Sequence, residues 1–241
     1  MVAGIAGFTV FALVLESLIH QAVIGKIIIR EEMPVQYIIY GIFMAGIFEE
    51  TARLIAYKIL KRKYNGIATA LSYGIGHGGI ESVLLGGFSM VYAIVICIMI
   101  NTGNIGLITG KMEGAALAAM NSQIETIMTS PAYVFLISGI ERLYATGIQL
   151  SLSVIMFYAV FGSKKIWLYP LAIGIHAFID IPAAAFQAGV LKSILPIEGL
   201  VLIFTILIII FARHIHRLYG NNPEIQPGAG KDLSPEKTAG L

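Results

Sequence analysis

A single cysteine, Cys97, occurs among the 241 residues, so neither an intrachain disulfide nor a cysteine-based metal site can form. Charge is also scarce: Asp, Glu, Lys and Arg make up 12% of the chain, against roughly a quarter in soluble domains. The net charge is only +2 and the basic residues are clustered, so a nucleic-acid partner is not expected. Hydrophobic residues, at 57%, take the place of the missing charge.

Long apolar runs account for most of the chain. A helix needs about 20 predominantly apolar residues to cross a bilayer. Runs of this kind lie at 2–29, 35–60, 67–86, 88–109, 132–161, 166–188 and 194–213. The stretch 111–131 is too polar for a clear span, yet the alternation of loops requires either a crossing there or a shifted boundary. The runs predict an all-α, polytopic transmembrane helix bundle of seven or eight spans, embedded in the lipid bilayer of the cell membrane.

The positions of lysine and arginine predict the orientation, because short loops rich in these residues face the cytoplasm. Three clusters qualify: Lys58 with Lys61, Arg62 and Lys63; Lys164 with Lys165; and Arg213 with Arg217. The loop REEMP at 30–34 has mixed charge and is expected outside, which leaves both termini cytoplasmic. The transmembrane domain is expected over 1–219. The polar, Gly- and Pro-rich stretch 220–241 is expected to form a disordered tail.

Ionisable residues interrupt several runs, although each costs several kcal/mol within a bilayer. Their depths agree. At about 1.5 Å per residue, Glu49 and Glu50 lie roughly 15 Å before the basic cluster at 61–63. His77 and His176 each follow a predicted cytoplasmic boundary by about the same distance. Three helices therefore bring carboxylates and imidazoles to one level, which indicates a shared functional site.

Helical spacing strengthens this prediction. Three pairs are four residues apart and share a helix face: Glu49 with Arg53, His77 with Glu81, and His176 with Asp180. An acid one turn from a histidine can orient the ring or act as a further metal ligand. Arg53 is expected to pair with a carboxylate, Glu49 first. Two further sets of ionisable residues are interpreted as structural: Glu16 with His20, and Glu141 with Arg142.

Two histidines and a glutamate in a membrane pocket suit few kinds of chemistry. In hydrolysis, the glutamate takes a proton from water, and the histidines hold a metal or stabilise the oxyanion. In proton-coupled transport, the same groups relay protons. A catalytically silent binding or immunity protein is a third alternative. The zinc-protease motif HExxH and the serine motif GxSxG are both absent, so metal ligands would have to come from separate helices.

Four segments in order, FEETAR, GIGHGGIES, ERLYA followed by LSLSV, and IHAFIDIP, resemble the YhfC family of intramembrane proteases. This family is related to PrsW and to the CAAX-protease and bacteriocin-processing (CPBP) enzymes. The resemblance covers roughly Ala45 to Ala185. The CPBP pattern of paired glutamates, a basic residue and two later histidines is filled here, in order, by Glu49, Glu50, Arg53, His77 and His176, with Asp180 where CPBP enzymes have Asn.

The resemblance implies an intramembrane peptidase that cuts a membrane protein or peptide. Glu49 is the favoured general base and Glu50 the alternative. His77 and His176 would hold Zn²⁺, with Glu81 as a further ligand, or stabilise the oxyanion. Asp180 and Glu81 would orient them. One departure weighs toward a silent protein: Gln149 stands where the family carries a histidine.

Overall fold

A computed structural model describes residues 1–162 and 165–221; in this part of the chain the regular elements are all helices joined by short loops, with no β-strand. The helices in chain order are α1 (Val2–Gly7), η1 (Phe8–Glu16), α2 (Ser17–Val23), α3 (Pro34–Leu60), α4 (Ile67–Glu81), η2 (Ser82–Gly87), α5 (Phe88–Asn101), α6 (Gly106–Thr109), α7 (Gly114–Thr129), α8 (Ala132–Phe161), α9 (Leu168–Gln187) and α10 (Ile194–Tyr219). Lys164 and nearly all of the predicted tail lie outside the described residues.

Five helical stretches within the described residues are long and apolar enough to cross a membrane: Val2–Val23, Ile67–Asn101, Ala132–Phe161, Leu168–Gln187 and Ile194–Tyr219. The 27-residue α3 has sufficient length but carries Glu49, Glu50 and Arg53, and it is not among the five. The predicted all-helical architecture is thus confirmed, whereas the predicted count of seven or eight spans is not.

The difference in count has two sources: α3 is not among the five, and residues 67–109 contribute one helix instead of two. The two predicted spans 67–86 and 88–109 form one continuous helix of 35 residues, Ile67–Asn101. Gly86 and Gly87 end the π-helical segment η2, and the backbone passes through them without a break. A Gly-Gly pair is itself a turn signal, but apolar residues flank it here on both sides and the helix continues. The stretch 111–131 forms α7, none of whose residues is buried.

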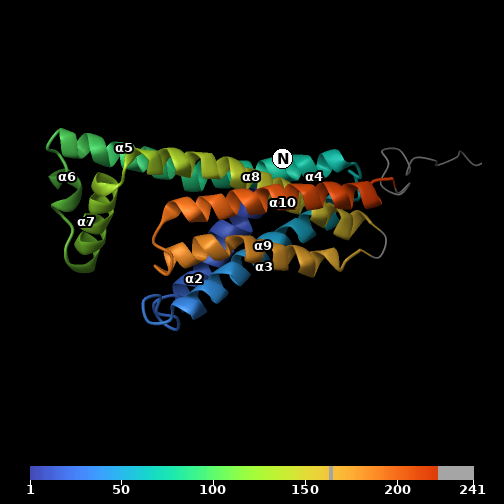
Figure 1. Ribbon diagram of the computed structural model, residues 1–241, viewed down its shortest axis with the longest axis horizontal. Coiled ribbons are helices and arrows are strands. Elements are labelled where there is room, and N and C mark those ends of the chain that lie inside the picture. The colour runs from blue at the N-terminus through green and yellow to red at the C-terminus, as the bar shows by residue number, and fades with distance from the viewer. Residues whose placement is uncertain (163–164, 222–241) are drawn as a thin grey trace, which may run out of the picture.

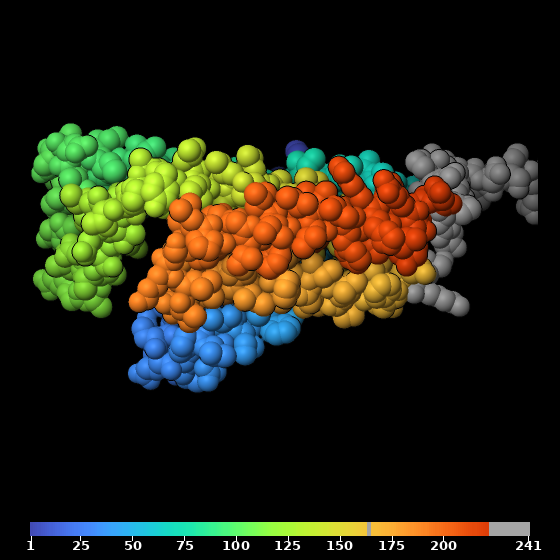
Figure 2. Space-filling model, in the orientation of Figure 1, coloured from blue at the N-terminus to red at the C-terminus, as the bar shows by residue number. Residues whose placement is uncertain are grey.

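The helices form a bundle with one projecting arm (Figure 1). In the bundle, α4 and α10 pack against α8, and α3 packs against α9, while the N-terminal helix lies on α3 and α4. The arm consists of α5, α6 and α7 and extends past the ends of the other helices. Figure 2 shows α7 standing apart from the bundle at this end.

The core of the bundle is rich in aromatic rings near the basic end, which carries Lys58, Lys61 and Lys165. Tyr57 of α3 is fully buried, and its ring centroid lies 5.1 Å from that of Tyr73 on α4. Phe157 of α8 stacks on Phe161 at 4.2 Å and lies edge-on to Tyr57. Lys58 directly follows Tyr57, so these rings lie between the centre of the bundle and its basic end.

Candidate active site

The structure brings the seven predicted site residues together from three helices. They are Glu49, Glu50 and Arg53 on α3, His77 and Glu81 on α4, and His176 and Asp180 on α9. All are buried except Asp180, whose side chain is 35% exposed. A residue on α8, Gln149, joins the groups of α3 and α4 into one hydrogen-bonded network.

Glu49 lies at the centre of this network. Its Oε2 accepts hydrogen bonds from His77 Nε2 and from Gln149 Nε2, both at 2.9 Å. His176 Nε2 lies 3.8 Å from the same oxygen. Oε1 receives no hydrogen bond from the part of the chain that the structure describes, so it can accept one from water. Glu49 also lines a cavity, whereas Glu50 is fully buried.

Arg53 neutralises the second glutamate. Its guanidinium forms an ion pair with Glu50, bonds to the side-chain oxygen of Gln149, and donates from Nε to Ser153 Oγ at 3.2 Å. Its nearest approach to Glu49 is 3.9 Å. The expected contact with Glu49 therefore exists, but the close partner is Glu50, one helical turn away on α3.

His176 is held in place from two sides. Its Nδ1 donates to Glu50 Oε1 at 2.9 Å. Its Nε2 lies 3.5 Å from Asp180 Oδ2, as the spacing of four residues on α9 predicted. This geometry turns Nε2 toward Glu49, so one ring nitrogen is anchored and the other faces the cavity.

His77 is covered by the N-terminal helix. A Cβ atom on Gly4 would meet the carbonyl oxygen of Tyr73 and lie 2.7 Å from the backbone nitrogen of His77. Only glycine allows α1 to approach α4 this closely. The ring of Phe8 then meets the His77 ring edge-on at 5.3 Å. His77 Nδ1 has no hydrogen-bond partner among the described residues.

One group of side chains could hold a metal ion. Glu49, His77 and Glu81 each offer one ligand atom, and these atoms lie within 4.8 Å of one another. The sequence-based prediction named His77, Glu81 and His176. The group contains two of these residues, with Glu49 in the place of His176. Arg142 Nη1 lies 3.7 Å from Glu81 Oε1 and pairs with Glu141, an orienting role consistent with the structural interpretation.

A cavity of about 480 Å³ leads to this group. Its inner end is formed by Glu49, Glu81 and His176, and its wall includes Glu16 and His20. His20 Nε2 lies 3.1 Å from Glu16. From the sequence, this pair is interpreted as structural. The structure shows instead that the pair borders the same cavity.

Gln149 is the residue whose importance the sequence analysis underrated. Its Nε2 donates to Glu49 Oε2 at 2.9 Å and to Glu81 Oε2 at 2.8 Å, while its oxygen accepts from Arg53. From the sequence, Gln149 is interpreted as a replacement for a histidine, one that puts metal binding in doubt if the histidine is a ligand and serves in its place if it only hydrogen-bonds. The signal that identifies its role is position: a buried amide in an apolar helix needs several partners.

Comparison with known proteins gives a consistent result. The model of the family described as YhfC intramembrane metalloprotease matches residues 1–201. The chain is also 34% identical over 203 residues to the uncharacterized membrane protein YhfC of Bacillus subtilis (strain 168), covering 82% of this chain and 77% of that protein. No solved structure matches. The chain therefore belongs to the YhfC family of membrane proteins.

Proposed function

We propose that the protein is an intramembrane peptidase that hydrolyses a membrane protein or peptide with water activated by Glu49. One observation carries the proposal. Glu49 is fixed through Oε2 by His77 and Gln149 at the inner end of a cavity, while its other oxygen is open to water. A carboxylate held in this way has the geometry that a general base requires.

In this mechanism Glu49 takes a proton from a water molecule in the cavity, and the resulting hydroxide attacks the carbonyl carbon of the scissile peptide. His176 Nε2 faces Glu49 across 3.8 Å. When its ring carries a proton on both nitrogens, it is placed to hydrogen-bond the oxyanion from Nε2, and the proton that Glu49 took from water passes to the leaving amine. Glu50 and Asp180 act as positioning residues, because they hold the ring of His176.

A divalent cation fits the donor set. Two carboxylates and one imidazole are ligands that Zn²⁺ accepts, and Glu49, His77 and Glu81 would hold it. When bound, such an ion supplies Lewis-acid polarisation of the carbonyl and acidifies water. Gln149 and Arg142 contact the two carboxylates from outside and would orient them.

The packing gives the site an entrance on one side. This shape suits a hydrolase that is reached from one face of the membrane, and a transporter would have to open the same site to each face in turn. In the described residues, the rings of Tyr57, Tyr73 and Phe157 fill the space between Glu49 and the basic end. The cavity is lined only on the other side of the site.

The test uses purified protein reconstituted in liposomes with membrane proteins of Bacillus subtilis, and new N-termini are identified by mass spectrometry. Glu49→Gln keeps the shape of the side chain and removes its basicity, so cleavage should fall at least about a hundredfold. The matched control is Glu141→Gln, because Glu141 also lines the cavity but pairs with Arg142 rather than with Glu49 or its two donors.

Cleavage by the wild type and by the Glu141→Gln variant, with none by Glu49→Gln, would support the proposal. Equal cleavage by Glu49→Gln would remove Glu49 from the role of base. A wild type that cuts nothing and instead moves protons across the liposome membrane would favour the transporter.

A further inference from the structure

On each helix, the residues that line the cavity lie between the site and the same end of the bundle. On α3 they include Tyr37, Gly41, Ala45 and Glu49, which are spaced by four residues and form a stripe from the first turn of the helix to the site. On this helix the lining stops at Glu49. None of the residues between Glu50 and the basic end of α3 takes part.

The other helices repeat this pattern. On α9 the lining begins at His176 and continues to Gln187, the last residue of the helix. On α8, which runs toward the basic end, it stops at Gln149. On the N-terminal helix it extends past His20 to Ile24, where the helix has ended. The cavity thus joins the site to one end of the bundle.

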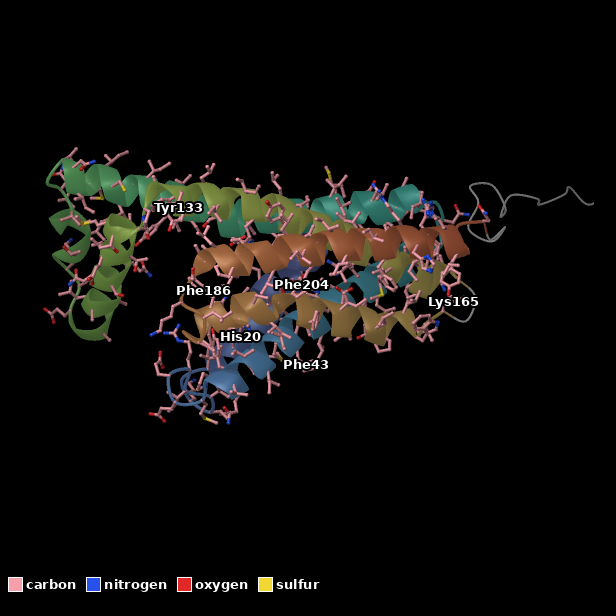
Figure 3. The ribbon with its side chains drawn as sticks, in the orientation of Figure 1. His20, Phe43, Tyr133, Lys165, Phe186 and Phe204 are labelled. Carbon is pink, nitrogen blue, oxygen red and sulfur yellow. The ribbon has the colours of Figure 1, made fainter. Side chains whose placement is uncertain are left out.

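This end is opposite the three basic clusters that contain Lys58, Lys165 and Arg213, although Lys26 and Lys192 lie on its loops. His20 and Phe186 lie at one end of the bundle and Lys165 at the other (Figure 3). Toward Lys165 the bundle is closed by fully buried side chains, among them Tyr57 and Leu168. Among the described residues, the cavity has no lining on that side of the site.

We propose that water and substrate reach the site from the end of the bundle opposite the basic loops, which is the extracytoplasmic end under the rule that lysine-rich loops face the cytoplasm. The proposal rests on the proposed peptidase function. It defines the substrate class: a membrane-attached peptide whose scissile bond lies at, or just below, the extracytoplasmic surface.

The wall of the cavity suits a hydrated entrance. Glu16 and His20 face it, and His20 Nδ1 lies 3.0 Å from Tyr40 Oη, so the pair is held by a third polar group. Tyr37 and Gln187 lie at the mouth, with 3.5 Å between the hydroxyl and the amide oxygen. Polar side chains along a path within a membrane mark a route for water rather than for lipid tails.

The test measures from which side of the membrane a small charged thiol reagent reaches the site. Cys97 is first replaced by alanine. Single cysteines are then placed at Ala183, which lines the cavity, and at Ala172, a buried position on α9 on the basic side of His176. Two exposed positions report the two ends: Arg30→Cys and Lys61→Cys. A trimethylammonium-ethyl methanethiosulfonate, which does not cross membranes, is added to right-side-out or inside-out vesicles.

We expect Ala183→Cys to react at least tenfold faster in right-side-out vesicles, as Arg30→Cys does, and Lys61→Cys to react only in inside-out vesicles. Ala172→Cys should react in neither preparation before denaturation. Reaction of Ala183→Cys from the Lys61 side would overturn the proposal, as would reaction of Ala172→Cys from that side. If Arg30→Cys and Ala183→Cys both react only in inside-out vesicles, the extracytoplasmic assignment is wrong.

The outcome is independent of peptidase activity, because labelling requires no turnover. A protein that shows the expected labelling but no cleavage would contradict the proposed function and leave the access route in place. A protein that cleaves but is labelled from the basic side would support the proposed function and contradict the access route.

Discussion

Arg53 forms its ion pair with Glu50, the residue directly beside the proposed base, and both side chains are fully buried. The two adjacent glutamates therefore have different contacts and different proposed roles. Glu50 is neutralised by Arg53 and anchors His176, whereas Glu49 accepts hydrogen bonds from His77 and Gln149 and borders the cavity. The two carboxylates should therefore respond differently to the same substitution.

Arg53→Ala is expected to destabilise the protein by about 3–5 kcal/mol, because it leaves the buried carboxylate of Glu50 without a counter-charge. Thermal unfolding in detergent, followed by tryptophan fluorescence, measures the change. Arg30→Ala is the control, since it removes an exposed pair with Glu31 that contributes about 0–1 kcal/mol. Equal unfolding temperatures for the two variants would contradict the structural role of Arg53.

Glu50→Gln should lower the unfolding temperature more than Glu49→Gln does. The first change removes the close ion-pair partner of the Arg53 guanidinium and leaves only the carboxylate of Glu49 at 3.9 Å, at a cost of several kcal/mol for a buried pair. At Glu49, the new amide still accepts a hydrogen bond through its oxygen. Purified Glu49→Gln should therefore show near wild-type yield together with the loss of cleavage. The opposite order of stability would mean that the two glutamates have exchanged roles.

Metal content separates the two candidate ligand sets. If the ion is held by Glu49, His77 and Glu81, the wild type should bind about one divalent cation per chain. His77→Ala and Glu81→Gln should each lose it, while His176→Ala should retain it and still fail to cleave. Elemental analysis by plasma mass spectrometry gives the stoichiometry. Loss of the ion in His176→Ala, with retention in Glu81→Gln, would restore the histidine pair as ligands.

Gln149→Leu removes the amide that bonds Glu49, Glu81 and Arg53 while keeping a similar volume. Leaving these groups short of partners should cost about 1–3 kcal/mol for each one affected. Cleavage should fall even under conditions where the variant stays folded, because Glu49 loses one of its two donors. Gln187→Leu at the cavity mouth is the matched control and should change unfolding little. If both variants unfold at the same temperature, Gln149 does not hold the network together.

Gly4→Ala should loosen the N-terminal helix from α4, since its Cβ atom would collide with the backbone of Tyr73. Overpacking of this kind costs about 1–3 kcal/mol. Gly79→Ala is the control, because no atom lies within 4 Å of its added methyl group. Proteolysis in detergent reports on the release of the helix. Faster cleavage near the N-terminus is expected only for Gly4→Ala, and identical digestion patterns would argue against the close contact.

Much of the site could be predicted from spacing along single helices. Glu49 with Arg53, His77 with Glu81, and His176 with Asp180 were expected to share faces because a helix repeats every 3.6 residues. Equal distance from the basic loops placed the three helices at one level. The structure brings these residues together. The boundaries of the spans were predicted less accurately. Hydropathy alone does not distinguish one helix of 35 residues from two helices joined at Gly86 and Gly87.

The sequence by itself therefore determined the helical architecture, the membrane setting and the residues that meet, since all three depend on local periodicity and on the cost of charge in an apolar environment. Only the tertiary structure decided the partner of each charge and the direction in which the cavity opens. Arg53 could reach Glu49 or Glu50 from the same turn, and the choice depends on Gln149 and His176, which arrive from other helices. Such contacts join residues about 100 positions apart, and no spacing rule within one helix contains them.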